Sequence, residues 1–220
     1  MTSVRAWLLK GAASITLLLI VAGGAGAASG PSGPSIDNRI RGKADAPVTM
    51  IEYSDFTCGY CLKFFKETWP KIQARYVDTG KLRFLYKDYP RADTGPGLTA
   101  ALAARCAGDQ GMYWPMHDRL FSADGRLDAD SYTEHAKAIG LGPSQFRQCL
   151  RDAPHVQAIF QDRQEANSWG FRGTPGFVLM RTTQQPTTKD PAIAIPGAFP
   201  FEAFVEEIEK LLLAPGEKQK

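Results

Sequence analysis

The stretch Tyr53-Ser54-Asp55-Phe56-Thr57-Cys58-Gly59-Tyr60-Cys61 decides the fold, because it places a C-x-x-C pair directly behind a strand pattern. Residues 48–53, VTMIEY, form a short apolar run that predicts a strand. Over residues 62–76, apolar side chains recur at steps of three and four, which predicts a helix that ends at Gly80 and is kinked at Pro70. The two cysteines therefore mark the junction between a strand and a helix.

A cysteine at the start of a helix differs chemically from one inside it. Cys58 would face unpaired backbone N–H groups and the positive end of the helix dipole, which stabilise a thiolate and lower its pKa. Cys61, one turn further on, would be buried and able to reach the first sulfur. One nucleophilic and one resolving cysteine are what thiol–disulfide exchange through a mixed disulfide requires.

Two other readings of the C-x-x-C pair are possible. Half of a zinc site would need two more ligands at matching spacing, but His117, His135 and His155 are 18 and 20 residues apart and Cys106 and Cys149 stand alone. An inert structural disulfide would constrain the unfolded chain little, because it closes a ring of four residues. We therefore expect a redox pair, with no metal and no organic cofactor.

The remaining elements extend this core. Residues 82–86, LRFLY, predict a second strand, and a strand, helix and strand in this order predict a parallel βαβ unit. Residues 96–169 carry helical patterns broken by Gly and Pro, with no strand signal, which indicates a helical insertion. Strand signals return at 176–180 and 192–195, and residues 201–212 predict a closing amphipathic helix.

The N-terminus has the pattern of an export signal. Arg5 and Lys10 precede the apolar run 11–22, and Ala25-Gly26-Ala27 offers a cleavage site, so residues 1–27 are predicted to be a secretory signal peptide. An uncleaved anchor is the alternative. Because no cysteine follows the apolar run, a lipoprotein anchor is not expected. An oxidising compartment follows, and the bacterial periplasm fits best.

Composition limits the class of protein. Of the 220 residues, 44% are hydrophobic and 22% are charged, which is typical of one folded domain, with or without an insertion. Without Arg5 and Lys10, 24 basic residues stand against 23 acidic ones. A nearly neutral chain gives no support for binding nucleic acid, which requires a concentrated basic surface. Residues 28–47, rich in Gly, Ser and Pro, are predicted to be a flexible lead-in.

The second pair of cysteines has a structural pattern. Cys106 and Cys149 lie 43 residues apart, both inside the helical insertion. Closing such a loop could contribute up to about 4 kcal/mol in the chain-entropy model, and free thiols would be a liability in an oxidising compartment. We expect a disulfide between them; two buried free thiols that pack as small apolar residues are the alternative.

The sequence resembles the DsbA-type thiol–disulfide oxidoreductases of the thioredoxin-fold superfamily over residues 43–213. The resemblance rests on the stretch quoted first, on the helical insertion and on Gly173-Thr174-Pro175-Gly176. It implies an α/β, thioredoxin-like fold with a helical insertion domain, in which 48–95 and 170–213 form the thioredoxin-like part. It also implies that Pro175 is cis and that Thr174 faces Cys58, an arrangement that would expose backbone to an incoming peptide. An ordinary turn before a strand is the alternative.

Two further roles follow from the resemblance. The family has a buried acid six residues before the nucleophile, here Glu52, which would relay the proton of Cys61; strand alternation also permits an exposed side chain. The best-known members carry Pro-His between the cysteines, where this chain has Gly59-Tyr60. Because Tyr carries no charge at pH 7, we predict a weaker oxidant.

An apolar lip for substrate is also expected. Tyr60 would form it together with Phe56 and Phe171, although Phe171 could equally be a core residue.

The expected function is that of a periplasmic oxidoreductase that donates its Cys58–Cys61 disulfide to reduced, unfolded exported proteins. The family implies reoxidation by a quinone-linked membrane protein of the DsbB or VKOR type. A disulfide reductase or isomerase is one alternative, and an envelope chaperone without redox turnover is another. Because residues 28–47 are too short for a separate dimerisation domain, a monomer is expected.

Overall fold

The computed structural model describes residues 38–122, 127–182 and 191–213. The predicted signal peptide, residues 1–27, and the first part of the predicted lead-in lie outside these ranges. Among the described residues, none of the helices combines the length and the apolar character needed to cross a bilayer.

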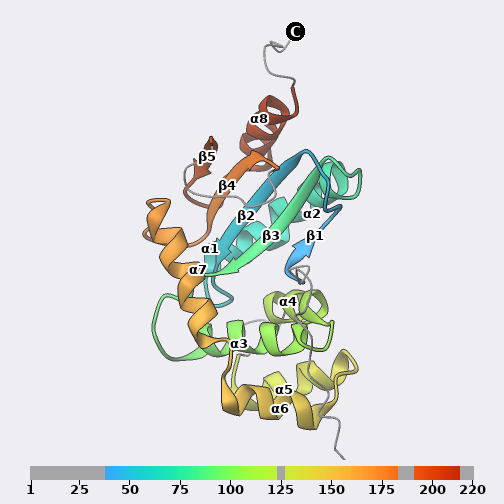
Figure 1. Cartoon of the computed structure of the whole chain (residues 1–220), viewed down its shortest axis with the longest axis vertical. Helices are drawn as coiled ribbons and strands as arrows, with labels where there is room; N and C mark the ends of the chain where they lie inside the picture. Colours follow the sequence, from blue (N-terminus) through green and yellow to red (C-terminus); the bar gives the residue numbers. More distant parts are fainter. Residues whose placement is uncertain (1–37, 123–126, 183–190, 214–220) are drawn as a thin grey trace, which may run out of the picture. The chain divides into compact units, whose positions relative to one another are not determined.

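A mixed five-stranded sheet forms the centre of the fold (Figure 1). Its strands, in spatial order, are β1 (Ile40–Arg41), β3 (Leu82–Asp88), β2 (Val48–Ser54), β4 (Gly176–Arg181) and β5 (Ala192–Ile195). The β2–β3 pair is parallel, as the βαβ pattern predicts, and the other neighbouring pairs are antiparallel. The antiparallel β2–β4 pair sets Tyr53 opposite Gly176, which brings the end of β2 next to the start of β4.

The edge strand β1 corrects one part of the prediction that residues 28–47 are a flexible lead-in, because residues 40 and 41 form a paired strand. Ile40 and Arg41 pair with Leu85 and Phe84 of β3. The Arg41 guanidinium lies 4.2 Å from the ring centroid of Trp114 and forms an ion pair with Asp118 at 2.8 Å. A strand of two residues has no periodicity to detect, and these contacts join residues far apart in the chain.

The helix behind the C-x-x-C pair is continuous but uneven. It consists of α1 (Gly59–Lys63), the π-helical segment η1 (Phe64–Thr68), α2 (Trp69–Ile72) and a second π-helical segment, η2 (Gln73–Val77). Pro70 is the second residue of α2, in the first turn where a missing N–H is best tolerated, so the expected irregularity takes the form of π turns on either side. Gly80, with a φ of +75°, follows the helix.

The two faces of the sheet are covered by different helices. Val48 and Met50 face the core formed with α1, η1, α2, η2 and α8 (Phe201–Leu212), whereas Ile51 and Tyr53 face a second cluster that includes Ala166 of α7 (Val156–Ser168). Side chains alternate along a strand, so Glu52 lies on the same face as Met50. Cys61 packs in that same core.

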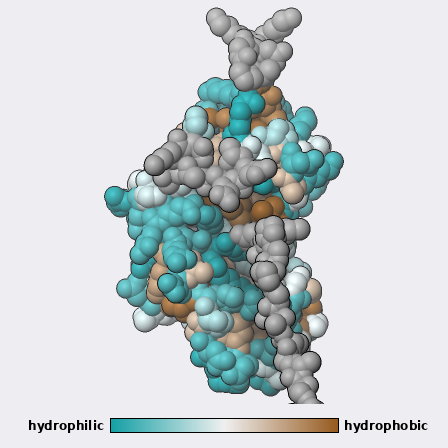
Figure 2. Space-filling view, viewed as in Figure 1, coloured by the Kyte–Doolittle hydropathy of each residue, from teal (hydrophilic) through white to brown (hydrophobic). Residues whose placement is uncertain are grey.

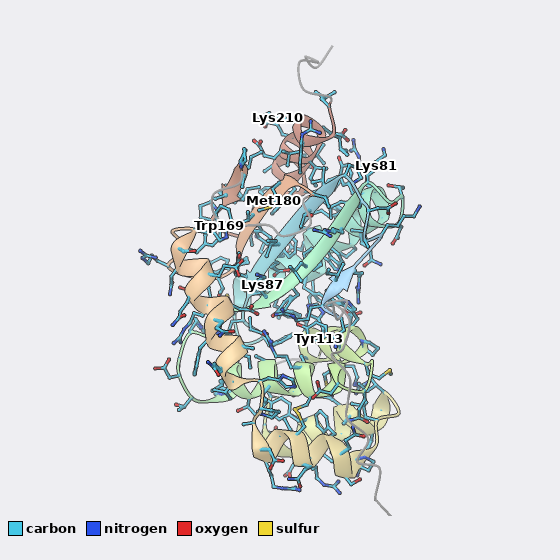
Figure 3. The ribbon with its side chains drawn as sticks, viewed as in Figure 1. Lys81, Lys87, Tyr113, Trp169, Met180 and Lys210 are labelled. Atoms are coloured by element: carbon cyan, nitrogen blue, oxygen red, sulfur yellow. A yellow bond between two sulfur atoms is a disulfide. The ribbon has the colours of Figure 1, made fainter. Side chains whose placement is uncertain are left out.

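The insertion contains α3 (Pro96–Gly108), α4 (Tyr113–Ser122), α5 (Ala129–Ala138) and α6 (Pro143–Asp152), followed by α7. A disulfide joins Cys106 of α3 to Cys149 of α6, with the Cα atoms 5.8 Å apart (Figure 3). The last helix, α7, belongs to both parts of the fold, because it also packs on the sheet. A boundary at residue 169 therefore separates the parts less sharply than expected.

A buried ion-pair network fastens the insertion to the sheet. Arg105 of α3 contacts Asp88 of β3 at 2.6 Å and Asp162 of α7 at 2.5 Å. Arg39, beside β1, contacts the same Asp162 oxygen at 2.5 Å. On the face viewed in Figure 2, hydrophilic residues dominate and hydrophobic residues occupy small separate areas.

Candidate active site

Cys58 stands at the N-terminal cap of α1, with φ −85° and ψ 120°. Its backbone N–H donates to the carbonyl oxygen of Asp55 at 3.0 Å. The buried Asp55 carboxylate accepts hydrogen bonds from the backbone and hydroxyl of Thr57, at 2.7 and 2.6 Å, and from the backbone of Arg91, at 3.0 Å. These bonds fix the turn between β2 and α1, so the sulfur is held at the positive end of the helix.

The peptide bond between Thr174 and Pro175 is cis, and it lies beside this sulfur. The Cys58 thiol donates to the carbonyl oxygen of Thr174 over 3.3 Å. The contact follows from the sheet, because Pro175 directly precedes β4 and β4 pairs with β2. The structure thus brings Cys58, Thr174 and Pro175 together, in the arrangement that the family resemblance implied.

The surroundings of Cys58 favour its thiolate and lower its pKa to about 5. The largest cause is the hydrogen bond from the Cys61 thiol, which acts against the opposing effect of burial. The Thr174 side chain and the backbone N–H groups of Cys61 and Tyr60 stabilise the anion further. The lowered pKa therefore arises from donors aimed at one sulfur at the start of a helix.

Cys61 has the opposite character. Its side chain is fully buried, and burial raises the pKa of its thiol above the usual range, with the bond to Cys58 and the charge of Glu52 adding to the effect. Glu52 itself is buried, and the loss of hydration raises its pKa to about 8. The nearby Ser54 hydroxyl opposes both shifts. The charge of Glu52 thus favours the protonated form of Cys61, and the charge of Cys58 adds to the raised pKa of Glu52.

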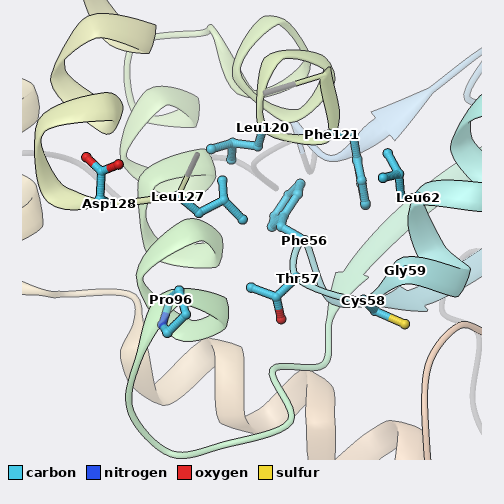
Figure 4. A pocket seen from close by; sticks show the side chains of 10 residues that line it. All are labelled: Phe56, Thr57, Cys58, Gly59, Leu62, Pro96, Leu120, Phe121, Leu127 and Asp128. Atoms are coloured by element: carbon cyan, nitrogen blue, oxygen red, sulfur yellow. The ribbon is translucent and has the colours of Figure 1, made fainter. Parts of the chain in front are cut away.

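Two hollows flank Cys58. The larger, about 450 Å³, reaches from Cys58 and Gly59 to the insertion, where Leu120, Phe121 and Leu127 face Phe56 (Figure 4). Phe56 is 6% exposed, with its ring centroid 4.8 Å from that of Phe121, so it belongs to the floor of this pocket.

The smaller hollow, about 310 Å³, lies against the cis peptide bond. Its lining is made by Tyr60, Thr174, Pro175, Gly197, Ala198, Phe199 and Pro200. Tyr60 and Phe199 are 69% and 44% exposed and are the large hydrophobic side chains that the described surface leaves open.

The expected lip of Phe56, Tyr60 and Phe171 is not formed as one surface. Phe171 is 4% exposed and packs with Tyr53, at 5.8 Å between ring centroids, on the other face of the sheet. Proximity in sequence to the Gly-Thr-Pro segment placed it wrongly, because the turn at Gly170 directs the ring into the core. Phe56 and Tyr60 line separate hollows.

Sequence reasoning missed Asp55 and Phe199. An Asp two residues before a Thr is a known signal for a side chain that caps its own turn, and this signal could have identified Asp55. Phe199 has no such signal, because its position depends on the packing of the segment between β5 and α8. Among the described residues, the group of three potential metal ligands lies elsewhere, at Cys106, Cys149 and His155.

Comparisons with known proteins agree with this geometry. Residues 35–190 match a family model described as Thioredoxin. The solved structure of Wolbachia pipientis alpha-DsbA1 superposes with a TM-score of 0.66 at 26% identity, covering 79% of this chain and 90% of that one. A putative protein-disulfide oxidoreductase of Rickettsia bellii is 22% identical over 149 residues, which are 65% of this chain and 57% of the relative.

A third relative is the Na(+)/H(+) antiporter NhaA 1 of Salinispora arenicola, 34% identical over 150 residues. These residues are 68% of this chain but 22% of the antiporter, so the chain spans about a fifth of that protein's length. The central sheet and the C-x-x-C pair beside a cis-proline define a thioredoxin-fold protein. The chain belongs to the thioredoxin family, and within it to the DsbA-type thiol–disulfide oxidoreductases.

Proposed function

We propose that the protein donates a disulfide between Cys58 and Cys61 to reduced exported proteins. The observation that carries this proposal is the opposite character of the two thiols. Cys58 has a pKa of about 5 and contacts the cis peptide bond, whereas Cys61 is buried with a raised pKa. A sulfur that is stable as a thiolate is a good leaving group, so such a pair passes its disulfide on readily.

The proposed exchange runs in two steps. A substrate thiolate attacks the sulfur of Cys58 in the oxidised protein, forming a mixed disulfide and breaking the Cys58–Cys61 bond. Cys61 leaves as a thiolate and takes up a proton. A second substrate thiolate then attacks the substrate sulfur of the mixed disulfide and expels Cys58 as a thiolate. Two electrons pass to the protein, and the substrate gains one disulfide.

Glu52 is the proposed source of the proton for Cys61. Its pKa of about 8 keeps the carboxyl group protonated at neutral pH. The Cys61 thiolate released in the first step would be a buried charge that has lost its hydration, which costs free energy. A nearby acid that protonates it therefore lowers the barrier to its formation. In the return direction the same carboxylate accepts the proton.

The substrate is proposed to be an unfolded chain that binds along the cis peptide bond. An extended peptide could pair with the backbone of Thr174, which would place a cysteine of that peptide at Cys58. Apolar side chains on either side of that cysteine would occupy the two hollows, against Phe121 and Phe199. Unfolded proteins expose such side chains and folded ones bury them, so this lining favours clients that have not yet folded.

Location and partners form part of the same proposal. The signal-like N-terminus supports export to the periplasm, with an uncleaved anchor as the alternative. Each turnover leaves the dithiol, so a membrane protein that passes electrons to a quinone, of the DsbB or VKOR type, is the proposed reoxidant. We propose that the protein acts as a monomer.

The test uses oxidised protein and a reduced peptide that carries two cysteines and a fluorophore whose signal changes on ring closure. Wild type should oxidise the peptide with one thiol pair consumed per disulfide formed. Cys58→Ser should abolish the reaction. Cys61→Ser cannot form the Cys58–Cys61 disulfide, and when charged with an activated mixed disulfide at Cys58 it should oxidise the peptide for a single turnover, because the second peptide thiolate expels Cys58. A reductase would instead reduce insulin faster than it oxidises the peptide. If the protein were a chaperone without redox turnover, the Cys58→Ser variant would bind unfolded protein as well as wild type does.

A further inference from the structure

Four side chains of the helical insertion meet at a second cluster, outside the C-x-x-C site. The sulfurs of Cys106 and Cys149 and a ring nitrogen of His155 all lie within 4.8 Å of one another. One oxygen of Asp109 lies 2.8 Å from Nε2 of His155 and 3.5 Å from the sulfur of Cys149. Two sulfurs, a nitrogen and a carboxylate oxygen therefore converge on one spot.

The insertion places these groups by its helix ends. Cys106 and Asp109 lie one turn apart at the C-terminal end of α3, and Cys149 lies in the last turn of α6. His155 caps the start of α7. The turn between these helices passes through Ala153, whose φ of 49° is in the left-handed region that favours glycine. The packing that holds this turn also holds His155 beside Cys149.

We propose that these four residues bind a zinc ion when the Cys106–Cys149 disulfide is reduced. Zinc in proteins takes four ligands in a tetrahedron, drawn from Cys, His and carboxylate side chains. The two sulfurs of such a site lie about 3.8 Å apart, from a Zn–S distance of about 2.3 Å. The Cα atoms of the two cysteines are 5.8 Å apart, which leaves room for that separation by side-chain rotation.

The chemistry balances with a dithiol as the reductant. The dithiol passes two electrons to the Cys106–Cys149 disulfide and is itself oxidised to a disulfide, and both protein sulfurs become thiols. Zinc then binds them as thiolates, and two protons are released to solvent. In the return direction a disulfide oxidant takes two electrons from the bound thiolates and becomes a dithiol with two protons from solvent, so the protein disulfide reforms and the ion is expelled. Disulfide and zinc are thus alternative ways of joining α3 to α6.

Exposure supports the exchange. Cys106 is buried, but the side chains of Asp109 and His155 are 46% and 24% exposed, so an ion can enter from the solvent side. The carboxylate of Asp109 supplies the oxygen that completes the four ligands. Cys149 is also only partly buried, so the site is closed around Cys106 and open toward Cys149, Asp109 and His155.

The experiment uses the full chain with Cys58→Ser and Cys61→Ser, so that the C-x-x-C pair cannot bind metal. The protein is compared oxidised and after reduction with dithiothreitol and its removal under argon. Zinc binding is measured by competition with a coloured chelator, and cobalt is used as a spectroscopic probe. The reduced protein should bind one ion and show the thiolate-to-cobalt absorption of a tetrahedral site, and the oxidised protein should bind none.

Single substitutions assign the ligands. His155→Gln and Asp109→Asn should each weaken zinc binding at least about tenfold, which is the smallest effect seen when even an outer partner of a metal ligand is lost. Asp152→Asn, at the exposed end of α6, is the matched control and should leave binding unchanged. Failure of the reduced protein to retain zinc against the chelator would overturn the proposal, as would equal binding by all three variants.

Circular dichroism separates binding from folding. If the reduced, metal-free protein loses helix, zinc should restore the signal and cobalt should give the same spectrum. A reduced protein that stays unfolded with zinc, and that gives no absorption band with cobalt, would also refute the site. These outcomes do not depend on disulfide donation by Cys58, so the two proposals fail independently.

Discussion

The sulfur of Cys58 lies 3.3 Å from the carbonyl oxygen of Thr174, although 116 residues separate them in the chain. The antiparallel pairing of β2 with β4 makes this contact, because it sets the end of one strand beside the start of the other. A nucleophile and an open stretch of backbone therefore form one site. A peptide that pairs with that backbone brings its own sulfur to Cys58 without any rearrangement of the fold.

Replacing Cys61 by Ala should raise the pKa of Cys58. The hydrogen bond from Cys61 is the largest cause of the lowered value of about 5, and its loss leaves the weaker donors to act against burial. The ultraviolet absorbance of the thiolate is followed against pH. The midpoint of this titration should move upward by at least about one pH unit, the equivalent of about 1.4 kcal/mol. Tyr60→Phe keeps the backbone donor and serves as the control, which should titrate like wild type. An unchanged midpoint in Cys61→Ala would show that the backbone alone holds the thiolate.

Replacing Tyr60 by His should make the protein a stronger oxidant. Tyr60 is exposed beside the site and brings no positive charge, whereas a protonated His would favour the Cys58 thiolate and hence the reduced form. Each 1.4 kcal/mol gained by the reduced form raises the reduction potential by about 30 mV, and we expect a rise of that order. Equilibration with glutathione buffers measures it, with Tyr60→Phe again as the control. A potential that does not move, or that falls, would contradict the prediction of a weaker oxidant.

The elements with a local sequence signal were predictable from the sequence, and the predicted thioredoxin-like fold is confirmed. The strand at 48–53, the cysteine pair behind it and the parallel strand at 82–86 all have short-range patterns of alternation or spacing. The Gly-Thr-Pro segment was recognised by resemblance, and its bond to Pro175 is cis. These features needed no knowledge of which distant residues touch.

What the sequence left open depends on tertiary contacts. Strand β1 is held in place by the contacts of Arg41 with Trp114 and Asp118. A strand of two residues is too short to show an alternating sequence pattern. Phe171 and Phe199 are both apolar residues in loops, and only the packing decides that one is buried and the other exposed. The site is likewise divided into two hollows by side chains from segments far apart in the chain.

Replacing Glu52 by Gln should change how stability depends on pH. The pKa of Glu52 is raised from 4.5 in the unfolded chain to about 8 in the fold, so the folded state binds the extra proton between these values. Stability from this group is therefore full below pH 4.5 and declines as the pH rises toward 8. The Gln variant lacks this decline and should exceed wild type at pH 8.5, with near equality at pH 4.5.

Urea denaturation of the oxidised proteins at the two pH values measures the effect, because the oxidised form has no thiols at 58 and 61 to titrate. Glu202→Gln, at an exposed position in the first turn of α8, is the control and should follow wild type. A Gln variant that loses stability at both pH values would mean that the carboxyl group makes a bond in the fold that the amide cannot replace.

Replacing Asp55 by Ala should loosen the turn that presents Cys58. The carboxylate accepts three hydrogen bonds from Thr57 and Arg91, and its loss takes the acceptor away from three partly buried donors. A fully buried donor without a partner costs about 1–3 kcal/mol, and each partly buried donor costs less, so the three together should fall in this range. Denaturation by urea should show a loss in this range, and the rate of peptide oxidation should fall as well. The exposed Asp45→Ala is the matched control, and equal behaviour of the two variants would remove Asp55 from the site.

Replacing Arg105 by Leu should weaken the attachment of the insertion to the sheet and lower the free energy of unfolding strongly. Arg105 lies between Asp88 and Asp162, and the charge of its guanidinium opposes the rise that burial imposes on the pKa of Asp88. Removing one partner of a buried pair typically costs about 3–5 kcal/mol, because the remaining charge is left without compensation. The exposed pair of Arg75 with Glu209 provides the matched control, and Arg75→Leu should cost at most about 1 kcal/mol.

The pH dependence of this loss identifies its cause. Without Arg105 the pKa of Asp88 should rise further, so the folded variant binds more protons than the unfolded chain and loses stability as the pH rises. The deficit of the variant against wild type should therefore be larger at pH 7.5 than at pH 5. Urea denaturation at both values measures it. A deficit of the same size at both pH values would mean that Arg105 stabilises the insertion through packing of its aliphatic part, and not through its charge.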